Sequence, residues 1–76
     1  MKRYLVEVGF AENFAEVDEW QTMDGLDCVE AESAEDAAKV GAWTDGLENA
    51  LFRVHELAEN EFGELEKTEE AEYFNF

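Results

Sequence analysis

Residues 26–43 read LDCVEAESAEDAAKVGAW, and the hydrophobic period changes in the middle of this stretch. The run from Leu26 to Ala31 is short and apolar, with β-branched Val29 at its centre, which is typical of a strand. Beyond it, small residues recur at the i, i+3, i+4, i+7 spacing of one buried helical stripe: Ala34, Ala37, Ala38 and Gly41. The stretch therefore predicts a strand that leads directly into a closely packed helix.

The predicted helix begins at Ser33 and ends near Trp43. Ser33 stands three residues before Asp36, which resembles a capping box, and acidic side chains in the first turn interact favourably with the peptide dipoles. Trp43 is expected to close one end of the core. Thr44-Asp45-Gly46 is expected to end the helix, with Gly46 as a C-terminal cap or turn residue.

Two other segments alternate as strands do. Residues 2–10 (KRYLVEVGF) place one set of side chains on a core face, namely Tyr4, Val6, Val8 and Phe10. Residues 50–57 (ALFRVHEL) direct Phe52 and Val54 to one face and His55 to the other. Both segments are predicted to pair with the strand at residues 26–32.

Two segments are ambiguous. Residues 11–24 favour an irregular or briefly helical connection, and residues 20–23 could instead enter the sheet; the Asp-Gly pair at 24–25 predicts a tight turn. Residues 61–76 favour a hairpin with a turn at 68–70 and an aromatic strand at 71–76, although a helix would also fit.

The order is thus β-β-α-β followed by a C-terminal hairpin. This predicts an α+β fold, in which a small, mostly antiparallel sheet carries one helix on one face. The 76 residues are expected to form a single domain, 1–76, near the lower size limit for one hydrophobic core. One cysteine excludes an internal disulfide, and no stretch resembles a signal peptide or a membrane span, so a cytoplasmic location is expected.

The charge is unusual: 21 acidic residues face five basic ones, for a net charge of −16. Residues 11–36 contain ten acids and no base, and residues 56–76 contain eight acids and one lysine. Such charge repels nucleic acid and disfavours the compact state. A basic partner, a saline cytoplasm, metal binding or solubility alone could explain it.

Catalytic and metal-binding motifs are absent from the sequence. Residues 24–27 (DGLD) lack the alternating oxygen ligands of a calcium loop. Cys28 is expected in or beside the core and His55 on an outer strand face, so a nucleophile–base pair is disfavoured. Neither an enzyme activity, a metal nor a cofactor is predicted. Trp20, beside Asp18 and Glu19, is either a core residue or an interface anchor.

The opening MKRYLVEV, the junction VEAESAEDAAK and the return strand ALFRVHEL together resemble small phage-encoded proteins. Some anti-CRISPR inhibitors share this strand–helix–strand order, and several acidic ones are DNA mimics. The resemblance implies a non-enzymatic inhibitor in the infected cell's cytoplasm. It would be a monomer or homodimer that binds the basic nucleic-acid surface of a Cas protein or another defence nuclease, with no membrane or direct nucleic-acid partner.

Such an inhibitor would use its two acidic blocks, because carboxylates spaced about 6.6 Å apart on a strand resemble a run of phosphates in charge density. The residues expected to contact the partner are Glu12, Glu16, Asp18, Glu19, Asp24, Asp27, Glu64, Glu66, Glu69 and Glu70. The alternative is an acid-adapted cytoplasmic protein of the kind that halophiles contain, although Glu outnumbers Asp and the charge is concentrated in blocks.

Overall fold

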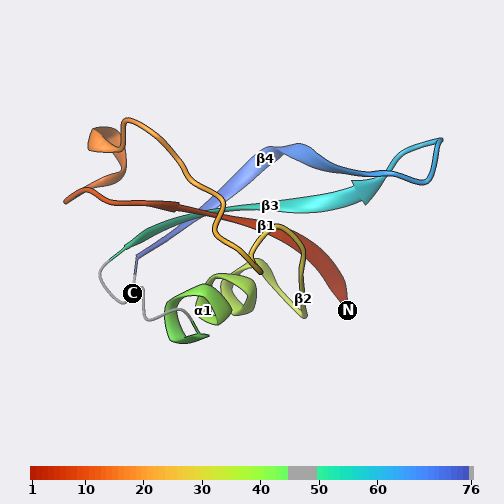
Figure 1. The fold of residues 1–76 in the computed structure, drawn as a ribbon, viewed down its shortest axis with the longest axis horizontal. Helices are drawn as coiled ribbons and strands as arrows, with labels where there is room; N and C mark the ends of the chain where they lie inside the picture. The colour runs from red at the N-terminus through yellow and green to blue at the C-terminus, as the bar shows by residue number, and fades with distance from the viewer. Residues whose placement is uncertain (45–49, 76) are drawn as a thin grey trace.

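A computed structural model describes residues 1–44 and 50–75 of the chain. Within these ranges the elements follow the order β1 (Lys2–Gly9), the 3-10 helix η1 (Phe14–Glu16), β2 (Val29–Ala31), α1 (Ala34–Thr44), β3 (Leu51–Glu59) and β4 (Leu65–Asn75). The strands form one antiparallel sheet in the order β2-β1-β3-β4. Helix α1 packs against one face of the sheet (Figure 1), which confirms the predicted α+β fold.

The core lies between α1 and the sheet. Side chains that alternate along β1 and β3 meet the small-residue stripe of the helix, and the buried set includes Tyr4, Val6, Val8, Phe52, Val54, Ala34, Ala37, Ala38 and Ala42. A Cβ atom on Gly41 would lie 3.3 Å from both Leu26 and Phe52, so glycine lets the helix approach the sheet closely. The predicted helical stripe is therefore the helix's buried face.

The start of the helix is also as predicted. The backbone N–H of Asp36 donates to Ser33 Oγ at 3.2 Å, which is the expected capping contact. The predicted end of the helix is only partly described, because Asp45 and Gly46 lie outside the described residues.

Trp43 is not in the core, contrary to the prediction. Its side chain is 73% exposed, and Lys39 Nζ lies 5.8 Å from its ring centroid. The reason is helical phase: Ala42 continues the buried stripe, and the next residue points about 100° away from it. Phe10 likewise leaves the core face, because β1 ends at Gly9 and the Phe10 side chain is 59% exposed.

The connection between β1 and β2 contains both features that the sequence left open. Phe14–Glu16 form one 3-10 turn, and Gln21 then enters the sheet through a bridge to Val8. The predicted turn at Asp24-Gly25 closes with a Leu26 N–H···O bond to Met23 at 3.0 Å, and Gly25 has a φ of +86°. The strand predicted at residues 26–32 is shorter than expected, at Val29–Ala31. It pairs with β1 but not with β3, so the expected pairing between residues 50–57 and this strand is wrong.

The hairpin predicted within residues 61–76 does not form, because its two expected strands and the turn between them at 68–70 belong to one strand. Residues 65–75 form one continuous strand, β4, which pairs with β3 across a turn at residues 60–64. Asn60 N–H donates to Glu64 O at 2.8 Å, and Gly63 has a φ of +78°. This turn outcompetes the predicted one at 68–70, because it supplies both a glycine at positive φ and an asparagine that bonds to the turn backbone.

Candidate partner-binding surface

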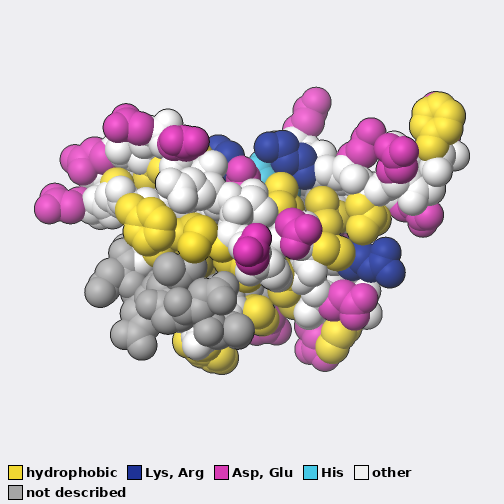
Figure 2. All heavy atoms as spheres, viewed as in Figure 1, with side chains coloured by type: hydrophobic (Ala, Val, Ile, Leu, Met, Phe, Trp, Pro, Cys, Tyr) yellow, Lys and Arg dark blue, Asp and Glu magenta, His cyan; other side chains and the backbone are white. Residues whose placement is uncertain are grey.

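The structure places all ten predicted contact residues on the surface, where each side chain is exposed. Those in residues 12–19 lie in the connection beyond the end of β1, whereas Glu64, Glu66, Glu69 and Glu70 lie on the β3–β4 hairpin. Figure 1 shows these two regions at opposite ends of the sheet, and Figure 2 shows acidic side chains gathered over both. The two acidic groups therefore form separate patches.

The hairpin patch surrounds an open hollow of about 550 Å³. Three of the predicted contact residues, Glu66, Glu69 and Glu70, line this hollow together with two acids that were not predicted as contacts, Glu56 and Glu59. Glu64, Asp24 and Asp27 do not line it. The hollow thus concentrates five carboxylates around one cation, Lys67.

A bulge in β4 explains why these carboxylates project from the sheet edge. His55 pairs with Ala71 and Leu57 pairs with Lys67, so β4 uses two more residues than β3 over this interval. The three residues 68–70, where a turn was predicted, thus lie opposite the single residue Glu56. A bulge redirects side chains and interrupts the hydrogen-bond ladder, so Glu69 and Glu70 leave the regular alternation.

Three of the five lysine and arginine residues form ion pairs with other acids. Lys2 pairs with Glu56 at 3.5 Å, Arg3 pairs with Glu30 at 3.7 Å, and Arg53 pairs with Glu7 at 2.9 Å. Over residues 1–44 and 50–75, none of the ten predicted contact residues forms an ion pair. Their charge is not neutralised within this part of the molecule.

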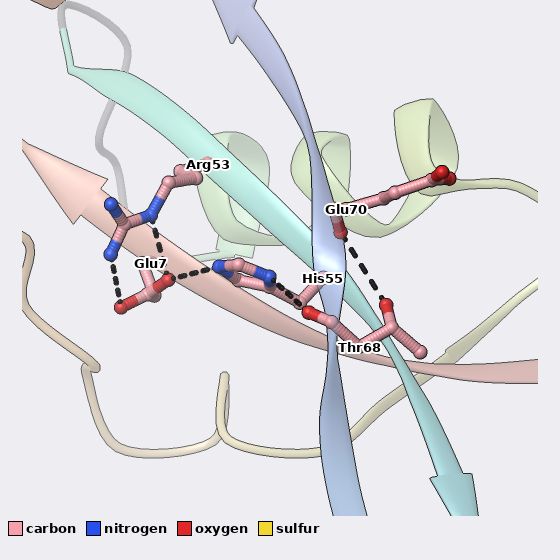
Figure 3. A network of polar contacts seen from close by, with 5 residues as sticks. All are labelled: Glu7, Arg53, His55, Thr68 and Glu70. Atoms are coloured by element: carbon pink, nitrogen blue, oxygen red, sulfur yellow. Dashed lines mark hydrogen bonds and ion pairs between the residues drawn. The ribbon is translucent and has the colours of Figure 1, made fainter.

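A polar network that the sequence analysis missed lies on the sheet face opposite α1 (Figure 3). Arg53 donates two hydrogen bonds to the Glu7 carboxylate, both at 2.9 Å. His55 Nδ1 lies 2.9 Å from Thr68 O and must donate, since a carbonyl only accepts. His55 Nε2 lies 2.9 Å from Glu7 Oε1 without hydrogen-bond geometry, and this contact is an ion pair when the imidazole is protonated.

Burial and charge act in opposite directions on Glu7. Burial alone would raise the pKa of this carboxyl, but the hydrogen bonds and charge of Arg53, with the charges of Lys67 and His55, lower it below the ordinary value. The hydrogen bond to Glu7 in turn raises the pKa of Arg53. The sequence contained one signal for this ion pair: Glu7 and Arg53 are opposite charges at outward positions of two predicted strands. The structure places them directly opposite each other across β1 and β3.

Cys28 and His55 are separated in the fold. Cys28 is exposed just before β2, so it does not lie within the core, one of the two positions expected for it, whereas His55 is buried on β3, with β1 between the two strands. The expected outer face of His55 is correct. In the described ranges, no group of three or more His, Cys, Asp or Glu side chains is arranged to hold a metal ion.

Trp20 packs on the outer face of the sheet, half-buried rather than in the core between sheet and helix. Its ring centroid lies 4.9 Å from the Arg53 guanidinium carbon, so Trp20 covers one side of the Glu7–Arg53 pair.

Comparison with known proteins adds no relative: no protein-family model, curated protein or solved structure matches this chain. Among the described helices, none has the length and apolar character needed to cross a membrane.

Proposed function

We propose that this protein is a non-enzymatic inhibitor that binds the basic nucleic-acid-binding surface of a target protein through its acidic patches. One observation carries the proposal: all ten predicted contact carboxylates are exposed, and none has an ion-pair partner in the described chain. Carboxylates without a countercharge attract a basic protein over a Debye length and need not break an internal pair to bind it.

The dimensions of the molecule support mimicry of a short duplex. Its longest dimension is 38 Å, and the other two are 23 and 19 Å. One turn of B-DNA is about 34–36 Å long, and 38 Å of duplex would carry about 22 phosphates. The chain's net charge of −16 is of the same order. A groove that holds one turn of duplex would meet a comparable charge over a comparable length.

In this role the protein would compete with nucleic acid for lysine and arginine side chains. The proposed targets are Cas proteins or complexes and other defence nucleases, and the proposed setting is the cytoplasm of a phage-infected cell. Electrostatic attraction would accelerate encounter, and bound protein would block the channel sterically. Binding would weaken steeply with salt, as protein–DNA binding does.

The test uses the protein first as bait and then as competitor. Immobilised protein is expected to capture a nucleic-acid-binding protein at about 50 mM salt and to release most of it by about 200 mM. The purified target is then loaded with fluorescent duplex, and displacement of the duplex is measured by anisotropy. A captured target that retains its duplex at saturating inhibitor would contradict the proposal.

Matched variants locate the interaction. E66Q/E69Q/E70Q neutralises three acids of the hairpin hollow, and E16Q/D18N/E19Q neutralises three acids of the connection. The control E32Q/E35Q/D36N removes the same charge near the start of α1, outside the proposed surface. We expect each of the first two variants to lose at least about tenfold in competition, since each removes several charge-assisted contacts. If all three variants lost competition with duplex equally, net charge alone would explain the effect. That result would contradict a defined binding surface.

A further inference from the structure

Three aromatic side chains gather on the sheet face opposite α1, next to the acidic connection. Phe14 comes from η1, Trp20 from the connection that follows it, and Tyr73 from β4. The Phe14 and Tyr73 ring centroids lie 5.4 Å apart, those of Trp20 and Tyr73 lie 6.0 Å apart, and those of Phe14 and Trp20 lie 6.5 Å apart. We refer to these three residues as the aromatic triad.

Two local features, a glycine in β1 and a capping asparagine, position the aromatic triad. A Cβ atom on Gly9 would lie 2.6 Å from Val17 and 3.1 Å from Trp20, so glycine at this position lets the connection lie against β1. Asn13 Oδ1 accepts a hydrogen bond from the Glu16 N–H at 3.1 Å and so fixes the turn that carries Phe14. The rings nonetheless stay open to solvent, because Phe14 is 37% exposed and Tyr73 is 52% exposed.

The triad already binds one guanidinium from its own chain. Arg53 lies over the Trp20 ring at 4.9 Å and donates two hydrogen bonds to Glu7. Arginine forms two contacts better than lysine does: its guanidinium stacks on an aromatic face, and it donates paired hydrogen bonds to a carboxylate in its own plane. The outward side of the triad offers the same two kinds of group, because Phe14 and Tyr73 are exposed and the exposed acids Glu16, Asp18 and Glu19 lie within two residues of Phe14 or Trp20 in the sequence.

We propose that the aromatic triad is a docking site for an arginine side chain of the basic partner, with the acids of the connection supplying the countercharge. This inference rests on the proposed function and names the contact that gives it specificity. Residues 11–36 contain no base, and the charge of Arg53 beside the triad is paired with Glu7, so the unpaired charge of the connection is negative. A second copy of this chain does not fit the site, because it would bring like charge against like charge.

The site can be tested with defined peptides. Nona-arginine and nona-lysine carry the same charge, and Trp20 fluorescence reports binding in a W43F background, in which the exposed Trp43 no longer contributes. We expect nona-arginine to bind roughly twofold to fivefold more tightly than nona-lysine, as expected for one exposed cation–π contact. We also expect nona-arginine to change the Trp20 emission.

The variants F14A and Y73A are expected to bring this arginine-to-lysine ratio to about one, whereas Y73F, which keeps the ring, is expected to preserve it. E16Q/D18N/E19Q is expected to weaken both peptides and E32Q/E35Q/D36N to weaken neither by as much. Circular dichroism confirms that each variant is folded, and Y73L replaces Y73A if the alanine variant unfolds.

Equal affinity for the two peptides in the parent protein, or a ratio that survives Y73A and F14A, would overturn the proposal. These outcomes are separate from failure of the proposed function, which is read from duplex displacement. An inhibitor that displaces duplex but does not distinguish arginine from lysine would retain the proposed function and exclude the docking site.

Discussion

At the scale of single residues, Glu7 is the acid that differs most from the others. Most acidic side chains of the described chain are exposed, whereas Glu7 is only 6% exposed and is held by Arg53 from the neighbouring strand. A buried carboxylate with a bidentate partner stabilises the folded state only while both partners are charged. Glu7 is therefore a structural acid, whereas most other carboxylates of the described chain face solvent.

We expect E7Q to lower the free energy of unfolding by about 2–3 kcal/mol at pH 7, because it weakens two charge-assisted hydrogen bonds and leaves Arg53 without its countercharge. The folded pKa of Glu7 lies below the unfolded value of about 4.5. The carboxylate's stabilisation is therefore present above that pH and is lost as the pH falls through the lower, folded value.

Urea unfolding of the parent protein and E7Q at pH 7, 5 and 3 measures this difference. The gap between the two proteins should be widest at pH 7 and should narrow by pH 3. Using the difference removes the effect of the remaining acids, which both proteins share. A gap that stays constant with pH would assign the loss to packing instead of charge.

The sequence predicted the face of Glu7 and of His55 correctly but not their burial. Alternation assigns a side chain to one side of a strand, but it does not show what covers that side. The cover here comes from Trp20 and from Thr68, which belong to a connection and a bulge without periodic patterns. Trp43 is instead more exposed than predicted: its size favoured the core, but its helical phase places it in solvent.

At the scale of elements, the β3–β4 hairpin is the least expected part of the fold. Its tip extends beyond the rest of the sheet (Figure 1) and carries Phe62, which is 79% exposed. Asn60 holds the turn: its Oδ1 accepts from the Phe62 and Glu64 N–H groups at 2.9 and 3.0 Å, and its Nδ2 donates to Glu66 at 3.0 Å. The side chain of one residue thus organises the turn and positions one carboxylate of the hollow.

We expect N60A to lower the free energy of unfolding by about 1–2 kcal/mol, because two backbone donors of the turn lose their acceptor. F62A is the matched control and should change stability by less than about 0.5 kcal/mol, since the Phe62 side chain is largely in solvent. Chemical denaturation measures both. Equal losses in N60A and F62A would show that contacts of the Phe62 ring, and not the asparagine, stabilise the turn.

The strand-to-helix junction was predictable because its period, its cap and its small-residue stripe all agree. The hairpin was not, because residues 61–76 contain two candidate turns and few apolar residues to fix the register. Hydrogen bonds to the Asn60 side chain stabilise the turn at residues 60–64. Residues 68–70, the other candidate turn, form the bulge that shapes the acidic hollow.

At the scale of the whole molecule, charge determines how the protein responds to salt. The core is small and the net charge is −16, so self-repulsion opposes a limited hydrophobic stabilisation. The hollow and the connection lie at opposite ends of the sheet, and the sequence could not group their acids in space because neither region has a regular pattern. It could identify the acidic blocks but not their separation into two patches.

We expect the protein to be folded at about 0.15 M salt and to gain stability modestly as salt screens this repulsion. Far-ultraviolet circular dichroism and thermal melts from low to molar sodium chloride measure the response. A chain that folds only in molar salt would instead favour the acid-adapted cytoplasmic protein. The E16Q/D18N/E19Q variant is the control, because these exposed acids have no ion-pair partner in the described chain and the variant should be stabilised at low salt if repulsion is the cause.

The bulged edge of β4 has a consequence for self-association. An edge strand exposes unpaired backbone donors and acceptors that can template the addition of another strand and begin a fibril. In β4 the two extra residues interrupt that template, and Glu66, Glu69, Glu70 and Glu72 would oppose like charges on any second copy. These carboxylates would be useful even without a target, because they keep a concentrated small protein dispersed. The acids of the connection do not lie on this edge strand and do not protect it from self-association. Their charge is therefore the more specific indication of partner binding.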